Sequence, residues 1–361
     1  MGGGARAERH VPRRLAFHAL SCDDHRTRPD RDPTSRARLR TGSTNGTAGY
    51  ALSRALDSEE SSLGHGEAVG GNMIDIDEPL VAALVSEQFP HWSTLRVRPV
   101  PRQGWDNRTF RLGDDLSVRL PSGEAYAAAV DKERRALEFL DGKLPVPVPG
   151  VMAVGAPNKD YPLPWSVRRW LPGDPIDESS LIDRVSLADD LGSVLRALRT
   201  LPAGAGASAG RHSFYRGCHP SVYSDQVQIA LDRLGDDVDA ERCREIWLAA
   251  TTSAWESEPV WFHGDVATGN LLAEDGRLSA VIDFGTCGIG DPACDLVIAW
   301  TYFDGEARTA FRESVGLDDA TWQRARGWAL WKALVTMSDQ SSPDPGRSQQ
   351  RVLAEVLSAA P

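Results

Sequence analysis

The fold of this chain is decided by Val260-Trp-Phe-His-Gly-Asp-Val-Ala-Thr-Gly-Asn-Leu-Leu and, shortly after it, Leu278-Ser-Ala-Val-Ile-Asp-Phe-Gly. Each segment begins with a short apolar run, which predicts a buried strand. Polar side chains follow: Asp265 and Asn270 come after the first strand, and Asp283 ends the second. Because strands fix positions and the loops after them present side chains, we expect one rigid site here.

The three polar side chains suit the transfer of a phosphoryl group. A carboxylate at Asp265 can orient a hydroxyl group and accept its proton. The amide oxygen of Asn270 and the carboxylate of Asp283 are hard oxygen ligands, of the kind that Mg²⁺ takes alongside phosphates. A base, an amide and a carboxylate in this order are the layout of kinases. We therefore expect Asp265 to be catalytic, and Asn270 and Asp283 to hold a metal ion.

The pattern H-G-D-x-x-x-x-N at 263–270, followed by I-D-F-G at 282–285, resembles the aminoglycoside phosphotransferase family, the small-molecule branch of the kinase-like proteins. The resemblance covers about residues 73–358. It implies an α+β, two-lobed protein-kinase-like fold, with a small antiparallel-sheet N-terminal lobe and a larger, mainly helical C-terminal lobe. It also implies Mg²⁺ as cofactor and ATP or GTP as phosphate donor.

The third expected strand, 116–120, carries Arg119 where the resembling family has a lysine. The helix expected after it, 125–140, carries Glu133. The resemblance implies that Arg119 holds the nucleotide phosphates and pairs with Glu133, because arginine keeps the charge and binds phosphate bidentately. A purely structural ion pair between the two residues is the alternative.

The segment Gln103-Gly-Trp-Asp-Asn-Arg lies between the first two expected strands, 95–101 and 109–112. A hairpin that contains glycine can lay backbone N–H groups over phosphates, so Gly104 is a candidate for nucleotide binding. The segment lacks the G-x-G-x-x-G pattern, and a plain hairpin turn explains it equally well.

The run Ser166-Val-Arg-Arg-Trp-Leu-Pro-Gly predicts an edge strand that ends at Pro-Gly. In the resembling family the equivalent strand leads into the hinge between the lobes, where backbone groups pair with adenine. The resemblance therefore makes Arg169, Trp170 and Leu171 candidates for nucleotide binding.

From residue 178 onward the chain is expected to be mainly helical. The clearest apolar stripe predicts a helix within 181–201. Its members are Leu187, Leu191, Val194, Leu195 and Leu198. A later helix, 318–337, carries three tryptophans, and aromatic residues at this density favour a helix–helix core over a ligand site.

Asp291 followed by Pro292 predicts the N-cap and first position of another helix. Asp295 falls in its first turn. The resemblance implies that Asp295 supports the catalytic loop through hydrogen bonds and is not itself catalytic. Capping and interaction with the helix dipole explain both aspartates about equally well.

Three parts are expected along the chain. Residues 1–72 are rich in Arg, Gly, Ser and Thr and lack sustained apolar periodicity, which predicts a disordered extension. Met73 is a plausible true start, and a basic tail for a partner is the alternative. Residues 73–171 are expected to form the nucleotide-binding lobe, and residues 172–361 the catalytic and acceptor-binding lobe.

Composition narrows the functional classes. The net charge is −11, and its acidic excess follows residue 72, which argues against nucleic acid as a partner and weakly suits a cationic substrate. The sequence has no apolar run near the ~18 residues of a membrane helix. Its five cysteines are scattered without a Cys-x-x-Cys pair, which favours free thiols in a reducing cytoplasm. No obligate protein partner is evident.

The leading hypothesis is a Mg²⁺-dependent kinase that moves the γ-phosphate of ATP or GTP to a hydroxyl of a small molecule, in the manner of an antibiotic kinase. Kinases of metabolites such as homoserine or choline share such folds. One alternative is a non-catalytic pseudokinase, with Arg119 as its only support. Another is a metal-dependent hydrolase with His263 and Asp265 as ligands. Protein substrates are disfavoured because Asp291 follows Asp283 within eight residues, which leaves no room for a long activation loop.

Overall fold

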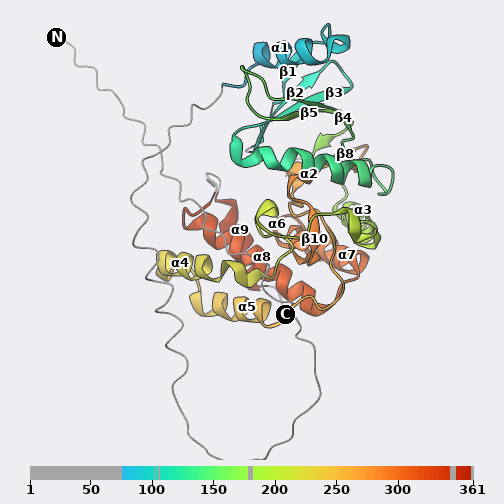
Figure 1. Ribbon diagram of the computed structural model, residues 1–361. Coiled ribbons are helices and arrows are strands. Elements are labelled where there is room, and N and C mark those ends of the chain that lie inside the picture. Colours follow the sequence, from blue (N-terminus) through green and yellow to red (C-terminus); the bar gives the residue numbers. More distant parts are fainter. Residues whose placement is uncertain (1–74, 102, 105, 178–181, 342–346, 359–361) are drawn as a thin grey trace, which may run out of the picture. The chain divides into compact units, whose positions relative to one another are not determined.

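The computed structural model describes residues 75–361 except for 102, 105, 178–181, 342–346 and 359–361. The extension expected at 1–72, and the start expected at Met73, lie outside the described residues. The described part has the expected α+β architecture, with an antiparallel sheet followed by a mainly helical region (Figure 1).

The sheet has five antiparallel strands in the order β1-β2-β3-β5-β4. Its strands are β1 (Val97–Pro99), β2 (Asn107–Leu112), β3 (Leu116–Pro121), β4 (Val151–Gly155) and β5 (Trp165–Arg169). In β3, Val118 and Leu120 are fully buried, and Phe110 lies opposite Val118 in the register of β2 and β3. Because side chains alternate between the two faces of a strand, Arg119 points away from this apolar face.

The expectation that 166–171 forms an edge strand is wrong. β5 pairs with β3 on one side and with β4 on the other, and its residues from Trp165 to Arg168 are buried. The strand at this edge of the sheet is β4, and its Met152 and Val154 are exposed. Pro172 lies beyond the end of β5, so its missing N–H removes no hydrogen bond from the sheet. The Pro-Gly pair therefore marks the end of the strand and does not indicate a position at the edge of the sheet.

Two helices accompany the sheet. Helix α1 (Glu78–Gln88) begins where the Asp77 carboxylate accepts a hydrogen bond of 2.9 Å from the Leu80 N–H. Helix α2 (Glu124–Leu140) lies between the sheet and the helical region in Figure 1. Helix α2 therefore has neighbours in both parts of the fold.

The helical region is built around α8. Its helices are α3 (Arg184–Thr200), α4 (Ser224–Leu234), α5 (Ala240–Thr252), α6 (Ile298–Thr301), α7 (Gly305–Val315), α8 (Asp319–Met337) and α9 (Ser348–Ser358). Most residues of α8 are buried, including Trp322, Trp328 and Trp331, so the prediction of a helix–helix core is confirmed. The five apolar residues predicted for the stripe of α3 are buried as well.

A buried ion pair connects α8 to the segment that begins at Asp291. The Arg324 guanidinium donates to the two carboxylate oxygens of Asp291 at 2.6 and 3.4 Å. Asp291 also accepts from the Ala293 N–H at 3.0 Å, which confirms it as the N-cap of a short 3₁₀ helix, Pro292–Leu296. Charges buried this deeply require such pairing, because an unpaired one is strongly destabilising.

Five short strands complete the helical region. They are β6 (Asp174–Pro175), β7 (Val260–Phe262), β8 (Leu271–Glu274), β9 (Arg277–Val281) and β10 (Gly288–Gly290). The two strands predicted from the apolar runs are therefore present as β7 and β9.

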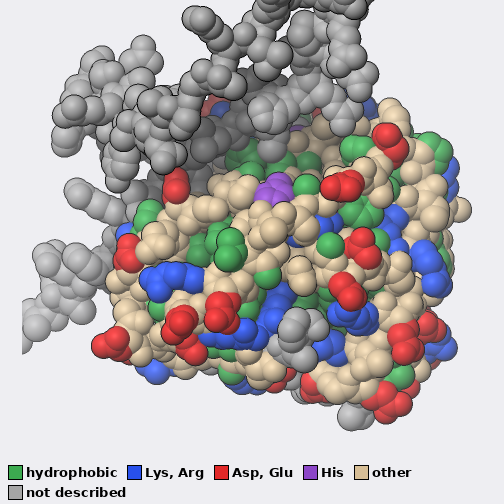
Figure 2. Space-filling model, turned by 90° about the horizontal axis from the view of Figure 1, so that it is seen from below, with side chains coloured by type: hydrophobic (Ala, Val, Ile, Leu, Met, Phe, Trp, Pro, Cys, Tyr) green, Lys and Arg blue, Asp and Glu red, His purple; other side chains and the backbone are tan. Residues whose placement is uncertain are grey.

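The surface is mixed in charge. On the face shown in Figure 2, Lys and Arg side chains are interspersed with Asp and Glu side chains. Among the described residues, no helix is both long and apolar enough to cross a membrane.

Candidate active site

The hairpin of β8 and β9 brings Asn270 beside Asp283. Leu271 pairs with Val281, and one residue further out the Ile282 N–H donates to the Asn270 carbonyl at 2.9 Å. The side-chain amide of Asn270 then donates to the backbone oxygen of Asp265 at 2.9 Å and to its carboxylate at 3.0 Å. The three residues predicted from the motif therefore lie together at one end of the hairpin.

A buried carboxylate supports the loop before Asp265. Asp295 accepts hydrogen bonds from the backbone N–H of His263 at 2.8 Å and of Gly264 at 2.7 Å. Burial raises the pKa of Asp295, and these two donors act in the opposite direction. The contacts are those expected of a residue that supports the catalytic loop, and they go beyond helix capping.

His263 joins the two segments of the motif. Its Nε2 lies 3.0 Å from the Ile282 carbonyl, and its Nδ1 accepts from the Asp265 N–H at 3.2 Å. These partners require the neutral tautomer with the proton on Nε2. With both ring nitrogens bonded to the backbone, His263 fits a structural role and not that of a metal ligand.

Arg119 reaches from β3 to the motif. Its guanidinium donates to a carboxylate oxygen of Asp283, and a second nitrogen lies 3.6 Å from Glu133. With its amide oxygen turned toward Arg119, Asn107 accepts from the guanidinium at 3.1 and 3.2 Å. Burial alone would lower the pKa of Arg119, but the carboxylates of Asp283 and Glu133 raise it overall. Arg119 thus stays charged beside Asp283.

The closest partner of Glu133 is Arg168, which the sequence did not single out. Two nitrogens of Arg168 donate to the two carboxylate oxygens of Glu133 at 2.7 and 2.8 Å, and both side chains are buried. Burial raises the pKa of Glu133, but Arg168 and then Arg119 lower it to a value below its usual range. The alternation of side chains along β5 predicts that Arg168 and Arg169 lie on opposite faces of the sheet. It does not predict which of the two faces α2.

The loop between β1 and β2 contributes Asp106 to the site. Burial, and then the charge of Asp283, raise the pKa of the Asp106 carboxyl, while Arg119 opposes them. Gly104 lies in the same loop, and its carbonyl accepts from Arg108 at 2.7 Å. Asp106 therefore interacts with the charged groups of the site, whereas the hydrogen bond at Gly104 stays within its own loop.

The three predicted hinge residues differ in what they offer. The N–H of Arg169 donates to the Gly150 carbonyl, and the N–H of Trp170 donates to the Asp115 carbonyl, both at 2.8 Å. Within the described residues, the N–H of Leu171 makes no such bond. The Leu171 side chain packs in a small apolar cluster with Leu272, Ala280 and Ile282. Of these three residues, Leu171 alone combines an N–H that has no partner among the described residues with a position close to Asp283.

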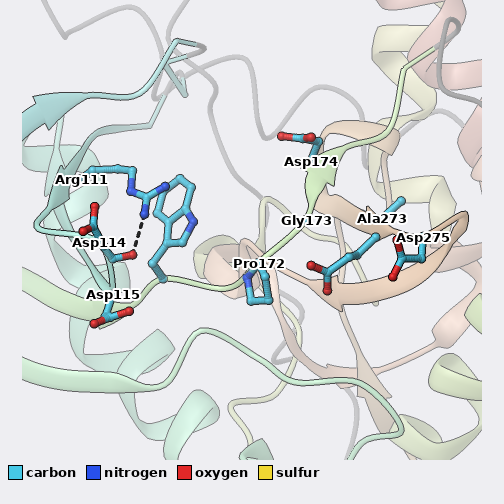
Figure 3. A pocket seen from close by; sticks show the side chains of 10 residues that line it. Arg111, Asp114, Asp115, Pro172, Gly173, Asp174, Ala273 and Asp275 are labelled. Atoms are coloured by element: carbon cyan, nitrogen blue, oxygen red, sulfur yellow. Dashed lines mark hydrogen bonds between the residues drawn. The ribbon is translucent and has the colours of Figure 1, made fainter.

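Trp170 lies against a different feature, a cavity of about 740 Å³. Arg111 lies on one side of it in Figure 3, and its guanidinium is 4.2 Å from the centre of the Trp170 ring. The carboxylates that line the cavity are those of Asp114, Asp115, Asp174, Glu274 and Asp275. None of Arg119, Asp265, Asn270 and Asp283 lines it, so the predicted catalytic and metal-binding side chains lie outside this cavity.

Comparison with known proteins agrees with this geometry. A family model described as the phosphotransferase enzyme family matches residues 97–328, which is more than half of the chain. The chain belongs to this phosphotransferase family. The matched range includes every predicted site residue, so the family assignment and the site rest on the same part of the molecule.

One curated relative of this phosphotransferase is the viomycin phosphotransferase of Streptomyces vinaceus. The two are 32% identical over 173 residues, which cover 45% of this chain and 58% of the relative. The match therefore spans less than two thirds of the relative's length.

Solved structures show the same two-lobed, kinase-like fold. The GDP complex of aminoglycoside 2'-phosphotransferase-IIIa has a TM-score of 0.60 at 18% identity, covering 78% of this chain and 99% of that one. The apoenzyme of a macrolide 2'-phosphotransferase from Brachybacterium faecium has a TM-score of 0.51 at 23% identity, covering 77% and 99%. At these identities the likeness establishes the fold alone.

Proposed function

We propose that this member of the family transfers the γ-phosphate of ATP or GTP to a hydroxyl group of a small molecule. The observation that carries the proposal is the cluster of Asp265, Asn270 and Asp283, with Arg119 bonded to Asp283. Residues 73–171 then bind the nucleotide, and residues 172–361 supply the catalytic loop and the acceptor site.

Asp265 is the proposed base. It is exposed, and Asn270 holds one of its carboxylate oxygens at 3.0 Å. From this position the carboxylate orients the acceptor hydroxyl and takes its proton, while a bond forms between the acceptor oxygen and phosphorus and the bond to the nucleoside diphosphate breaks. Positioning of this kind, together with charge neutralisation, supplies most of the rate in phosphoryl transfer.

Asn270 and Asp283 are the proposed ligands of Mg²⁺. Both hydrogen bonds of the Asn270 amide are made by its nitrogen, which leaves its oxygen for a cation. Among the described residues, no cluster of three or more His, Cys, Asp or Glu could hold a metal. The amide oxygen of Asn270 and the carboxylate of Asp283 fit Mg²⁺ better than zinc, because Mg²⁺ takes one or two protein ligands together with phosphates and waters. Bound Mg²⁺ neutralises phosphate charge.

Arg119 and Leu171 are the proposed nucleotide contacts. The Arg119 guanidinium faces the same carboxylate that would hold the metal, so it can reach the phosphates there. The Leu171 N–H and its apolar neighbours suit the edge and face of a nucleobase. Glu133 acts indirectly by fixing Arg119 and Arg168. Gly104, Arg169 and Trp170 are weaker candidates, because their hydrogen bonds are made with residues outside the cluster around Asp283.

An antibiotic is the proposed class of acceptor. The relatives named above are described as phosphotransferases of viomycin, aminoglycosides and macrolides. Metabolite acceptors such as homoserine or choline are the second possibility within the same reaction. A pseudokinase would retain nucleotide binding without transfer, and the retention of all three motif residues argues against it.

The decisive experiment is an acceptor screen. Purified protein is incubated with Mg²⁺, ATP or GTP and a panel of hydroxyl compounds that includes cationic peptide antibiotics, aminoglycosides, macrolides, homoserine and choline. We expect transfer to at least one antibiotic, and its loss in Asp265→Ala with nucleotide affinity unchanged. Nucleotide binding without turnover on the whole panel would favour the pseudokinase, and full activity in Asp265→Ala would remove Asp265 from the mechanism.

A further inference from the structure

Lys132 links α2 to the loop that follows Asp283. Its Nζ donates to the Gly285 carbonyl at 2.5 Å and to the Cys287 carbonyl at 3.2 Å. It also lies 3.1 Å from Nδ1 of His212, which belongs to a third segment. One ammonium group therefore joins a helix beside the sheet to two segments of the helical region.

The tautomer of His212 supports this arrangement. Its Nε2 lies 2.6 Å from the Ser208 carbonyl and must therefore carry the proton. Nδ1 is then an acceptor, and it faces the Lys132 ammonium. All three donors of Lys132 thus have acceptors, which offsets the cost of burying its charge.

Adjacent residues of α2 attach to opposite sides of the site. Glu133 binds Arg168 on β5 and faces Arg119 on β3, whereas Lys132 binds the loop that contains Gly285. The helix therefore fixes the distance between the phosphate-binding side and the metal-binding side.

The loop needs such support because of the backbone at Asp283. Its φ of 65° and ψ of 64° lie in the left-handed region. A residue other than glycine is strained in that region, and the conformation persists only where the surroundings hold it. Lys132 binds the carbonyls two and four residues after Asp283.

We propose that Lys132 is a positioning residue, which holds the Asp283 loop in the conformation that binds the metal–nucleotide complex. This inference rests on the proposed function of the site. Loss of the ammonium should release the loop, and residues that orient metal ligands typically contribute 10–100-fold to metal affinity. Binding of metal-free nucleotide should not change, because Arg119 and Leu171 do not contact Lys132.

The test compares Lys132→Met with Lys143→Met. Lys143 follows the end of α2, is exposed, and bonds the Phe139 carbonyl, so it is a matched control for removal of a lysine charge. Mn²⁺ affinity is measured by electron paramagnetic resonance with a non-hydrolysable ATP analogue present, and analogue affinity is measured separately in EDTA. We expect about a 10–100-fold loss of Mn²⁺ affinity in Lys132→Met alone, with unchanged affinity in EDTA.

Other outcomes are equally informative. Wild-type Mn²⁺ affinity in Lys132→Met, or an equal loss in EDTA, would overturn the inference. Lys132→Arg keeps the charge and should recover part of the affinity. If Lys132→Met does not fold, Lys132→Gln is measured; if that variant is also unfolded, the role is structural and the inference is wrong. Metal binding by a wild type that transfers phosphate to no acceptor would defeat the proposed function but leave the role of Lys132 intact.

Discussion

Gly264 offers a direct test of how the loop before Asp265 is built. Its φ is +85°, a conformation that side chains other than glycine rarely adopt. A methyl group added there would lie 2.9 Å from the backbone oxygen of Thr286 and 2.9 Å from its hydroxyl oxygen. Gly264→Ala should therefore force the loop to move, and Asp265 is the next residue.

The expected loss of stability in Gly264→Ala follows from a comparison with Gly276. Its φ is +77°, but nothing lies within 4 Å of an added methyl group. Gly276→Ala should lower the free energy of unfolding by the backbone cost alone, about 1–2 kcal/mol. Gly264→Ala adds the cost of overpacking, about 1–3 kcal/mol, for a total of roughly 2–5 kcal/mol. A displacement of about 1 Å at Asp265 should also lower turnover by about 100-fold.

Both quantities can be measured on the same preparations. Urea denaturation gives the free energy of unfolding of each variant, and turnover is followed with an acceptor found in the screen. Adding Thr286→Ala to Gly264→Ala removes the hydroxyl but leaves the backbone oxygen, so it should recover only part of the loss. Equal stability and equal turnover of Gly264→Ala and Gly276→Ala would refute the reasoning.

Three further predictions concern buried groups. Arg168→Met should lower the free energy of unfolding by about 3–5 kcal/mol in urea denaturation, because the buried Glu133 carboxylate loses its bidentate partner and keeps only the looser ion pair with Arg119 at 3.6 Å. The pKa of Glu133 lies below its ordinary value of 4.5, so its ionisation stabilises the fold fully above pH 4.5 and less as the pH falls through the lowered pKa. The stability difference between wild type and Glu133→Gln should therefore be constant near pH 7 and shrink below pH 4.5; a difference that grows there would contradict the assignment. Burial raises the pKa of Cys287 to about 12, so this thiol should resist a thiol-specific reagent at pH 8 until the protein unfolds, as read by mass spectrometry of the labelled peptides.

Much of the catalytic loop could be predicted from its local sequence. Asp265, Asn270 and Asp283 occupy the ends of short apolar strands, and the spacing along the chain alone brings Asn270 beside Asp283 in one hairpin. The N-cap at Asp291 was also predicted, and its side chain accepts from the Ala293 N–H as expected. Such features depend on neighbours within a few residues, so the local pattern contains them.

The errors and omissions concern contacts between distant segments. The run that includes Arg168 was expected at a sheet edge, but strand order depends on which strands pair, and that is not encoded within the strand itself. Lys132 lies in a charged run that is typical of a solvated helix face. It is buried only because a loop more than 150 residues later places two carbonyls against it.

The sequence by itself therefore determined the family through the spacing of its motif, and the resemblance to that family implied the two-lobed α+β fold. The same spacing predicted that Asp265, Asn270 and Asp283 lie together. Only the tertiary structure decided the partners of the buried charges. Glu133 binds Arg168 more closely than the expected Arg119, and Arg119 turns to Asp283. A buried charge takes whichever opposite charge the packing brings within reach, and that choice is made by the assembled sheet, helix and loop together.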